Sequence, residues 1–183
     1  MAKFLVIAEK PSVAQSLAKN LSAYQRKDGY LEGNSCIVSW CLGHLAEYAP
    51  PEIYNEKYAK WQFEDLPIIP EVWKVQVSED KKKQFDVLCG LINRADVAYL
   101  VNGCDAGREG ELIFKRVYDL AGCQKPVKRL WISSMEDEAI QKGFQSLTDG
   151  REYAGLCNAA VCRAQADWLI GMNGTRAYTT CYF

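Results

Sequence analysis

The chain has 183 residues, of which 49% are hydrophobic and 25% are charged, and its formal net charge is −1. These values are ordinary for one globular domain, or for one domain with the beginning of another. Because 22 Lys and Arg balance 23 Asp and Glu, a surface that binds nucleic acid would have to be a local patch. No segment has the apolar length of a membrane span, and the N-terminus is too short in apolar residues for a signal peptide, so we expect a cytoplasmic protein away from membranes.

The cysteines show no pair at the two-residue spacing that zinc knuckles usually have. We interpret all of them as reduced thiols in the core. The eight positions are Cys36, Cys41, Cys89, Cys104, Cys123, Cys157, Cys162 and Cys181.

The first third of the chain predicts a strand, a tight turn, a helix and a hairpin. Residues 3–9 form a continuous apolar run, which is typical of a strand buried on both faces. Pro11 then opens an apolar pattern of helical spacing, at a position where a helix tolerates proline. Residues 29–45 are typical of a hairpin that turns at 32–34, and residues 49–70, rich in Pro and Tyr, indicate a surface connection.

The middle of the chain alternates strands with helices. Residues 72–78 predict a strand, 79–95 an amphipathic helix, 96–103 a buried strand and 108–122 a second helix. Residues 127–133 predict another strand, and 134–147 another helix with Ser134 as its N-cap. This rhythm predicts an α/β fold with a mostly parallel, Rossmann-like sheet flanked by helices.

A boundary is expected at residues 148–153, where a glycine-containing turn precedes a long helical pattern. We therefore predict a first domain at residues 1–150. Residues 151–183 would be the helical beginning of a second domain, and the chain as a whole would be a fragment.

Crowded acidic residues follow the strand predicted at 96–103, in the sequence "CDAGREGEL". Like carboxylates repel one another, so their proximity costs free energy unless a cation lies among them. In an open parallel sheet, ligands bind outside the carboxyl ends of the strands, where Glu9 and Asp105 both lie. Together with Glu109 they would suit Mg²⁺, and the neighbouring Lys10 and Arg108 would suit a phosphate.

A purely structural interpretation of the same residues is equally open on pattern alone. The acids of the 108–122 helix would then complement its dipole, Asp105 would be a turn residue and Lys10 would be solvated. No P-loop sequence is present, so no nucleotide cofactor is expected.

Five ordered motifs together resemble the N-terminal part of type IA DNA topoisomerases, of the bacterial topoisomerase III type. They are "FLVIAEKPSVAQSLA", "GHL", "DAGREGELIF", "RLWISSMEDEAI" and "RAQADWLIGMNGTRAYT". The resemblance covers nearly the whole chain, most loosely across 50–95. It implies a Toprim domain and a magnesium-dependent, ATP-independent isomerase that cuts and rejoins one strand of DNA through a phosphotyrosine link.

The resemblance also implies roles for individual residues. Glu9 would ligate metal and assist proton transfer at the leaving 3′ oxygen, and Lys10 would hold the scissile phosphate. Asp105 and Glu109 would be acids of the metal-binding turn, whose second aspartate is replaced by Gly107. Arg108 would add positive charge at the phosphate.

The resemblance further implies a DNA-binding wall on the last helix. Arg163 and Asp167 are four residues apart, so they share a face of that helix, and Arg176 would join them in contacting single-stranded DNA. His44, the only histidine, could face the site or simply cap the hairpin. The aromatic residues at 48–61 could stack on bases, but covering the edge of a core is the more common role.

The nucleophilic tyrosine of the family belongs to a later motif that this sequence lacks, so the piece alone is expected to be inactive in strand passage and to be monomeric. Two alternatives stay open: a non-catalytic DNA-binding Toprim module, and a Toprim nuclease or primase.

Overall fold

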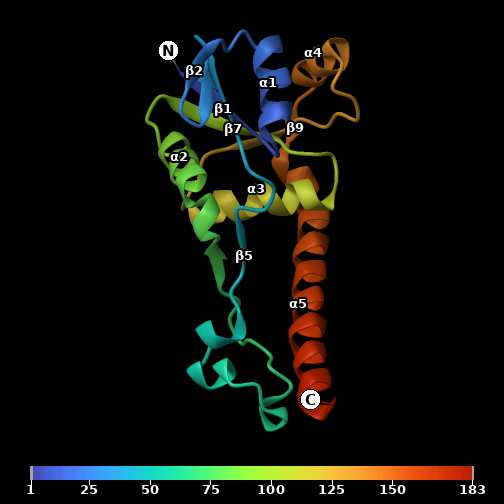
Figure 1. Cartoon of the computed structure of the whole chain (residues 1–183). Coiled ribbons are helices and arrows are strands. Elements are labelled where there is room, and N and C mark those ends of the chain that lie inside the picture. The colour runs from blue at the N-terminus through green and yellow to red at the C-terminus, as the bar shows by residue number, and fades with distance from the viewer. Residues whose placement is uncertain (1, 183) are drawn as a thin grey trace.

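A central mixed sheet organises the molecule, seen in a computed structural model that describes residues 2–182 (Figure 1). Across the sheet, its seven strands are β2 (Gln25–Lys27), β3 (Tyr30–Glu32), β4 (Cys36–Trp40), β1 (Lys3–Ala8), β7 (Val97–Gly103), β8 (Val127–Arg129) and β9 (Thr148–Asp149). The middle strands β4, β1, β7 and β8 are parallel, whereas β2, β3 and β9 run antiparallel to their neighbours. The predicted mostly parallel α/β fold is confirmed, with edge strands β2 and β9 that the sequence did not predict.

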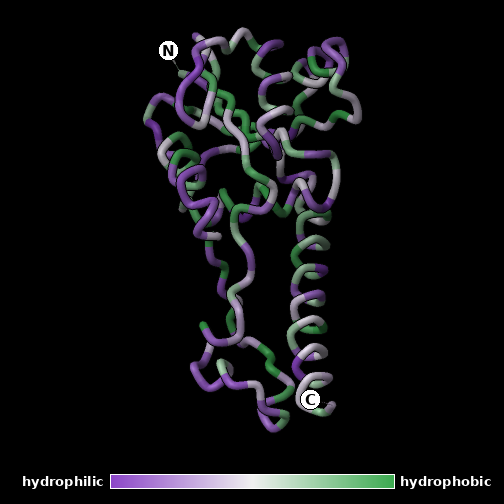
Figure 2. The backbone as a smooth tube through the Cα atoms, viewed as in Figure 1, coloured by the Kyte–Doolittle hydropathy of each residue, from purple (hydrophilic) through white to green (hydrophobic). Residues whose placement is uncertain are grey.

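Strand β1 lies at the centre because both of its faces are apolar. Leu5 and Ile7 pack into one core cluster, and Val6 and Ala8 pack into the other. Successive side chains of a strand point to opposite faces, so a continuous apolar run fills both layers at once. Figure 2 shows the hydrophobic residues of these central strands gathered inside the sheet layer.

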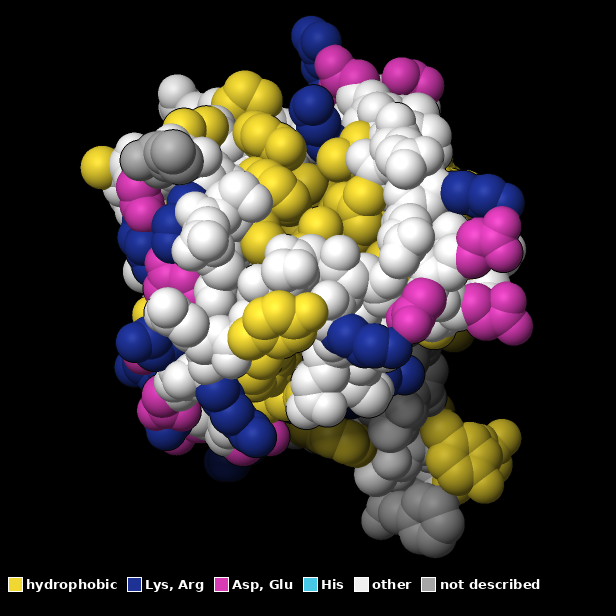
Figure 3. Space-filling model, turned by 90° about the horizontal axis from the view of Figure 1, so that it is seen from above, with side chains coloured by type: hydrophobic (Ala, Val, Ile, Leu, Met, Phe, Trp, Pro, Cys, Tyr) yellow, Lys and Arg dark blue, Asp and Glu magenta, His cyan; other side chains and the backbone are white. Residues whose placement is uncertain are grey.

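Helices cover the two faces in pairs. Helices α2 (Lys82–Ile92) and α3 (Arg108–Leu120) contribute to the cluster that contains Leu5. Helices α1 (Pro11–Asn20) and α4 (Asp137–Gln145) contribute to the cluster that contains Val6. Seen from above, apolar side chains gather in a hollow near the centre of this face, and most charged side chains lie toward its outline (Figure 3).

Two element ends differ from the prediction. Strand β8 ends at Arg129, and α4 begins only at Asp137, with Glu136 as its N-cap. Ser134 is therefore not the N-cap. Its hydroxyl accepts a hydrogen bond from the Glu136 amide at 3.2 Å, which closes a short turn just before the helix.

A second, elongated region extends away from the sheet (Figure 1). It contains the antiparallel ribbon β5 (Ala46–Tyr48) and β6 (Val75–Val77) and the 29-residue helix α5 (Ala154–Tyr182). The connection between β5 and β6 contains three short 3₁₀ turns, η1 (Pro51–Ile53), η2 (Glu56–Ala59) and η3 (Phe63–Asp65). Two more such turns, η4 (Glu79–Lys81) and η5 (Gly150–Tyr153), precede α2 and α5.

The connection is fastened to α5 by side chains of the helix. The Trp168 indole donates a hydrogen bond to the Ala49 carbonyl at 3.1 Å. The Asn173 amide group bonds both the N–H of Ile68, at 2.6 Å, and its carbonyl, at 2.9 Å. Tyr54 packs edge-on against Trp168, so this aromatic residue covers the edge of a core as expected.

The cysteines are all free thiols, as predicted, but they are not all in the core: Cys162 and Cys181 are exposed on α5. Between residues 2 and 182, no helix is both long enough and apolar enough to cross a membrane. The expected domain boundary near residue 150 stays a prediction.

Candidate phosphate and metal site

The candidate site lies at the carboxyl edge of β1 and β7. Ala8 of β1 is paired with Gly103 of β7, so the residues that follow them leave the sheet side by side. Glu9 follows the first strand, and Asp105 comes two residues after the second. This edge of a parallel sheet is where ligands of such folds bind.

Glu9 and Lys10 form the first half of the site. The Glu9 side chain is 12% exposed and that of Lys10 is 58% exposed, with 3.6 Å between the Lys10 Nζ and a Glu9 carboxylate oxygen. The Glu9 carbonyl accepts a hydrogen bond from the Gly43 amide at 3.2 Å, which fixes the backbone here. The sheltered Glu9 carboxylate thus lies beside the exposed Lys10 ammonium group. The flexible side chain of Lys10 allows this group to reach a phosphate.

The acidic turn forms the second half, and its shape depends on Gly110. A Cβ at Gly110 would lie 2.1 Å from the Asp105 carbonyl oxygen, so only glycine lets α3 begin this close beneath the turn. Gly107, in contrast, has an extended φ of 172°, and a Cβ there would meet no described atom within 4 Å. The space that the side chain of a second aspartate would occupy at position 107 is therefore open.

A buried arginine holds the turn from below. Arg129 is 1% exposed, and its guanidinium donates to the carbonyls of Cys104 at 2.6 Å and Asp105 at 2.7 Å. It also forms an ion pair with Glu111, whose carboxylate lies 2.6 Å from Nε. The second Glu111 oxygen accepts from Asn102 at 3.3 Å.

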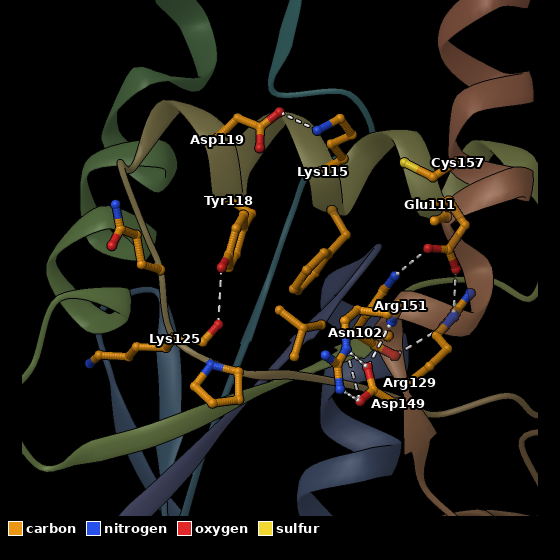
Figure 4. Close-up of a pocket in the computed structure, with 16 residues that line it drawn as sticks. Asn102, Glu111, Lys115, Tyr118, Asp119, Lys125, Arg129, Asp149, Arg151 and Cys157 are labelled. Carbon is orange, nitrogen blue, oxygen red and sulfur yellow. Dashed lines mark hydrogen bonds and ion pairs between the residues drawn. The ribbon is translucent and has the colours of Figure 1, made fainter.

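Sequence reasoning missed Arg129 and Glu111. The pattern suggests that Glu111 is an exposed acid of the helix start, but it is buried. The sequence feature that could have indicated this pair is the charged "KR" at residues 128–129, at the end of an apolar strand. An arginine that is buried in such a strand requires a carboxylate partner. Figure 4 shows Glu111 and Arg129 among the residues that line a cavity of about 590 Å³, together with residues of α3, β8 and the start of α5.

Cys104 lies between the two halves of the site. Its thiol is buried, and the pKa of that thiol is raised well above its usual range, first by a hydrogen bond with Cys41 and then by burial. The thiol is therefore neutral and unreactive at physiological pH.

Glu109 is not gathered with the other carboxylates. Its side chain is 71% exposed and lies 2.9 Å from the Nε2 atom of His44. Within residues 2–182, no group of three or more His, Cys, Asp or Glu side chains is arranged to hold a metal ion. Glu9, Asp105 and Glu109 thus share one edge of the sheet, with Glu9 and Glu109 each turned toward a neighbouring nitrogen. Arg108 is exposed in the first turn of α3.

The donors nevertheless fit magnesium in kind. All three are carboxylate oxygens, which are the ligands that Mg²⁺ takes while keeping several waters. Lys10 and Arg108 are exposed beside them and offer charge to a bound phosphate.

A groove next to the site is formed by α5 and the β5–β6 ribbon. Its volume is about 490 Å³, and it is lined by residues that include His44, Glu109, Arg163 and Asp167. Arg163 and Asp167 form the expected pair on one face of α5, at 3.0 Å. The groove therefore connects the acidic turn with the predicted DNA-binding face.

Arg176 lies apart from that groove. Its side chain is only 6% exposed and 3.9 Å from a Glu52 carboxylate oxygen, and its guanidinium lies over Trp61, 4.7 Å from the ring centroid. Arg176 therefore packs the connection against α5, and its contact with DNA stays a prediction.

Comparison with known proteins supports the fold. A family model described as "Toprim domain" matches residues 4–135. DNA topoisomerase 3 of Bacillus subtilis (strain 168) and that of Shouchella clausii (strain KSM-K16) are both 49% identical over 180 residues, which is 98% of this chain and 25% of each relative. The chain thus spans about a quarter of the length of these curated relatives. The solved structure of full-length topoisomerase I from Thermotoga maritima has a TM-score of 0.60 at 17% identity, covering 91% of this chain and 24% of that one, and supports the fold.

Proposed function

Because the chain belongs to the Toprim domain family, we propose that it is the phosphate-handling portion of a type IA DNA topoisomerase of the topoisomerase III type. The observation that carries this proposal is the shared edge of β1 and β7, where Glu9 and the acidic turn leave the sheet side by side. The similarity to about a quarter of the length of two DNA topoisomerase 3 proteins supports the same assignment.

The reaction we propose for the whole protein cuts one DNA strand by attack of a tyrosine on phosphorus and rejoins it later, so no ATP is needed. The tyrosine would belong to a region of the protein that this sequence does not contain. The Toprim domain would neutralise charge at the phosphate, orient the strand ends and supply a proton to the departing 3′ oxygen.

The residues of this chain divide these tasks. Lys10 and Arg108, both exposed, would bind the scissile phosphate. Glu9, whose side chain is sheltered beside Lys10, would assist proton transfer at the 3′ oxygen. Mg²⁺ held by Glu9, Asp105 and Glu109 would supply further positive charge at the phosphate.

The partner we propose for this groove is single-stranded DNA. Arg163 is exposed on α5 and lines the groove together with Glu109. The strand would run along α5 toward Lys10 as part of a monomeric cytoplasmic enzyme that needs no nucleotide cofactor.

Binding of a single-stranded oligonucleotide, followed by fluorescence anisotropy at several salt concentrations, tests this proposal. We expect weak binding that declines with salt, and we expect Lys10→Gln and Arg163→Gln each to reduce the slope of log K against log salt by about 0.7, because each removes one phosphate contact. Lys83→Gln is the matched control, since Lys83 is exposed and paired with Asp28 away from the site. Salt-independent binding, or equal slopes in all variants, would refute the DNA assignment.

A second candidate function is a DNA-binding module without catalysis. It is favoured by the absence of a three-carboxylate cluster within residues 2–182 and by the glycine at position 107. The two candidates differ in metal dependence, because only the first requires Mg²⁺ to bind at Asp105.

A further inference from the structure

His44 reaches the acidic turn because the loop after β4 follows the end of β1. The Cys41 amide donates to the Ala8 carbonyl at 2.8 Å, and the Gly43 amide donates to the Glu9 carbonyl at 3.2 Å. Gly43 has a φ of +68°, a left-handed conformation that favours glycine. The loop then turns so that the next residue, His44, meets α3.

The imidazole bridges two residues of α3. Its Nε2 lies 2.9 Å from a Glu109 oxygen, and its Nδ1 lies 3.4 Å from the NH1 of Arg116. Glu109 and Arg116 are seven residues apart, or about two helical turns, so they project from the same side of the helix. One histidine thus connects an arginine to an acid of the candidate site.

Arg116 and Glu109 together determine which nitrogen of the neutral histidine carries the hydrogen. A guanidinium has donors only, so the Nδ1 atom that faces Arg116 must be the acceptor. In the neutral ring the hydrogen is then on Nε2, which donates to the carboxylate of Glu109.

Arg116 is itself firmly held in place. NH1 also donates to the Ala46 carbonyl at 2.9 Å, and the guanidinium lies 4.8 Å from the Tyr48 ring centroid. Its Nε is buried without a hydrogen-bond partner among residues 2–182, which costs free energy. The contacts with Ala46 and Tyr48 thus hold the guanidinium beside His44.

We propose that His44 is a positioning residue that holds the Glu109 carboxylate at the groove that both residues line, through the Nε2–H ring tautomer that Arg116 and the carboxylate together fix. The inference rests on the proposed function. An exposed glutamate would otherwise sample many rotamers, and the His44 contact removes that freedom. It uses the Oε2 atom only and leaves Oε1 available to a cation in the groove that both residues line.

The tautomer can be measured directly, because His44 is the only histidine of the chain. Nitrogen NMR of ¹⁵N-histidine-labelled protein at mildly alkaline pH is expected to show the Nε2–H form. Arg116→Met should shift the Nδ1 resonance, because it removes the donor that faces this nitrogen, while the Glu109 carboxylate keeps the hydrogen on Nε2. Arg151→Met is the matched control, since Arg151 is exposed and paired with Asp149, and should leave the spectrum unchanged. An Nδ1–H ring, or a spectrum that Arg116→Met does not alter, would overturn the proposal.

Calorimetric titration with Mg²⁺ tests the positioning role. His44→Ala is expected to weaken binding about tenfold, as the loss of a ligand's hydrogen-bond partner does. His44→Gln should restore most of the affinity, because its amide can donate where Nε2–H did. Circular dichroism checks that each variant is folded.

The outcomes separate this inference from the proposed function. If the wild-type protein binds no Mg²⁺, the proposed metal site is wrong, and the NMR measurement still decides whether Arg116 and His44 orient Glu109. If the wild type binds and His44→Ala binds equally well, the positioning role is wrong. If both His44→Ala and His44→Gln lose binding, His44 is a direct ligand and the proposal also fails.

Discussion

Arg129 and Glu111 form an ion pair that is almost completely enclosed beneath the acidic turn, with 2.6 Å between the guanidinium Nε and the carboxylate. The same guanidinium donates to the carbonyl groups of Cys104 and Asp105. The position of the candidate metal-binding acid is therefore determined by a charge on a different strand, β8.

We expect Arg129→Met to destabilise the protein by about 3–5 kcal/mol, because it leaves the Glu111 carboxylate buried without its partner. Glu111→Gln should cost less, since a glutamine oxygen can still accept from Arg129. Urea unfolding followed by circular dichroism measures both. Lys142→Met is the control, because its pair with Glu138 is exposed and should contribute about 0–1 kcal/mol. An equal effect of Arg129→Met and Lys142→Met would contradict the structural role.

Gly107→Asp is expected to tighten Mg²⁺ binding. The backbone φ of 172° suits any residue, and a Cβ at this position meets no described atom within 4 Å, so the added carboxylate brings charge without strain. Asp105→Asn should abolish binding, because it removes charge with little change in shape. Calorimetry on the three proteins measures these effects.

Gly107→Ala provides the control for this prediction, since it adds the Cβ without the charge and should bind as the parent does. Equal Mg²⁺ binding by the wild type and Asp105→Asn would show that the acidic residues stabilise the start of α3 and do not bind a metal.

Stability should depend on pH through Glu32. Hydrogen bonds, first from Lys3 and also from Arg94, hold the pKa of Glu32 below its usual range. A carboxyl group whose pKa is lower in the folded chain stabilises the fold above its unfolded pKa of about 4.3, and this stabilisation is lost as the pH falls through the folded value.

Glu32→Gln should therefore be less stable than the wild type at neutral pH, and the difference should shrink as the solution is acidified below about pH 4. Urea midpoints at a series of pH values measure this. Glu138→Gln, which removes an exposed carboxylate, should follow the wild-type curve. Parallel curves for wild type and Glu32→Gln would refute the assignment.

Asn173→Leu should release the connection from α5. The Asn173 side chain bonds both backbone groups of Ile68, and leucine can form neither contact. Limited proteolysis with mass spectrometry should show faster cleavage near residues 60–70. Asn158→Leu is the control on the same helix, at an exposed position. Identical cleavage rates in the two variants would argue against this anchor.

The sequence predicted the central strands and the helices that cover them, because their apolar periodicity is strong and local. It also placed Glu9 and Asp105 at one edge, since the carboxyl ends of parallel strands coincide. The short strands β2 and β9 were missed, because each has only two or three residues and owes its extended form to a neighbour in the sheet.

The contacts around the site could not be predicted in the same way. The pairing of His44 with Glu109 joins residues 65 positions apart, and that of Glu111 with Arg129 joins two elements. Such pairs depend on how helices pack on a sheet, which periodicity does not specify. The contact of the Arg176 guanidinium with the Trp61 ring is a further long-range pair of this kind.

Helix α5 and the β5–β6 ribbon attach the elongated region to the sheet layer at separate places. Because an α-helix rises about 1.5 Å per residue, α5 is roughly 43 Å long, and a tilt of about 5° at its base would carry its far end nearly 4 Å. Trp168 and Asn173 tie the helix to the segment that the ribbon carries. Helix α5, the connection and the β5–β6 ribbon are therefore linked mechanically at both ends. A force applied at the far end of α5 is transmitted to the ribbon, which begins two residues after His44.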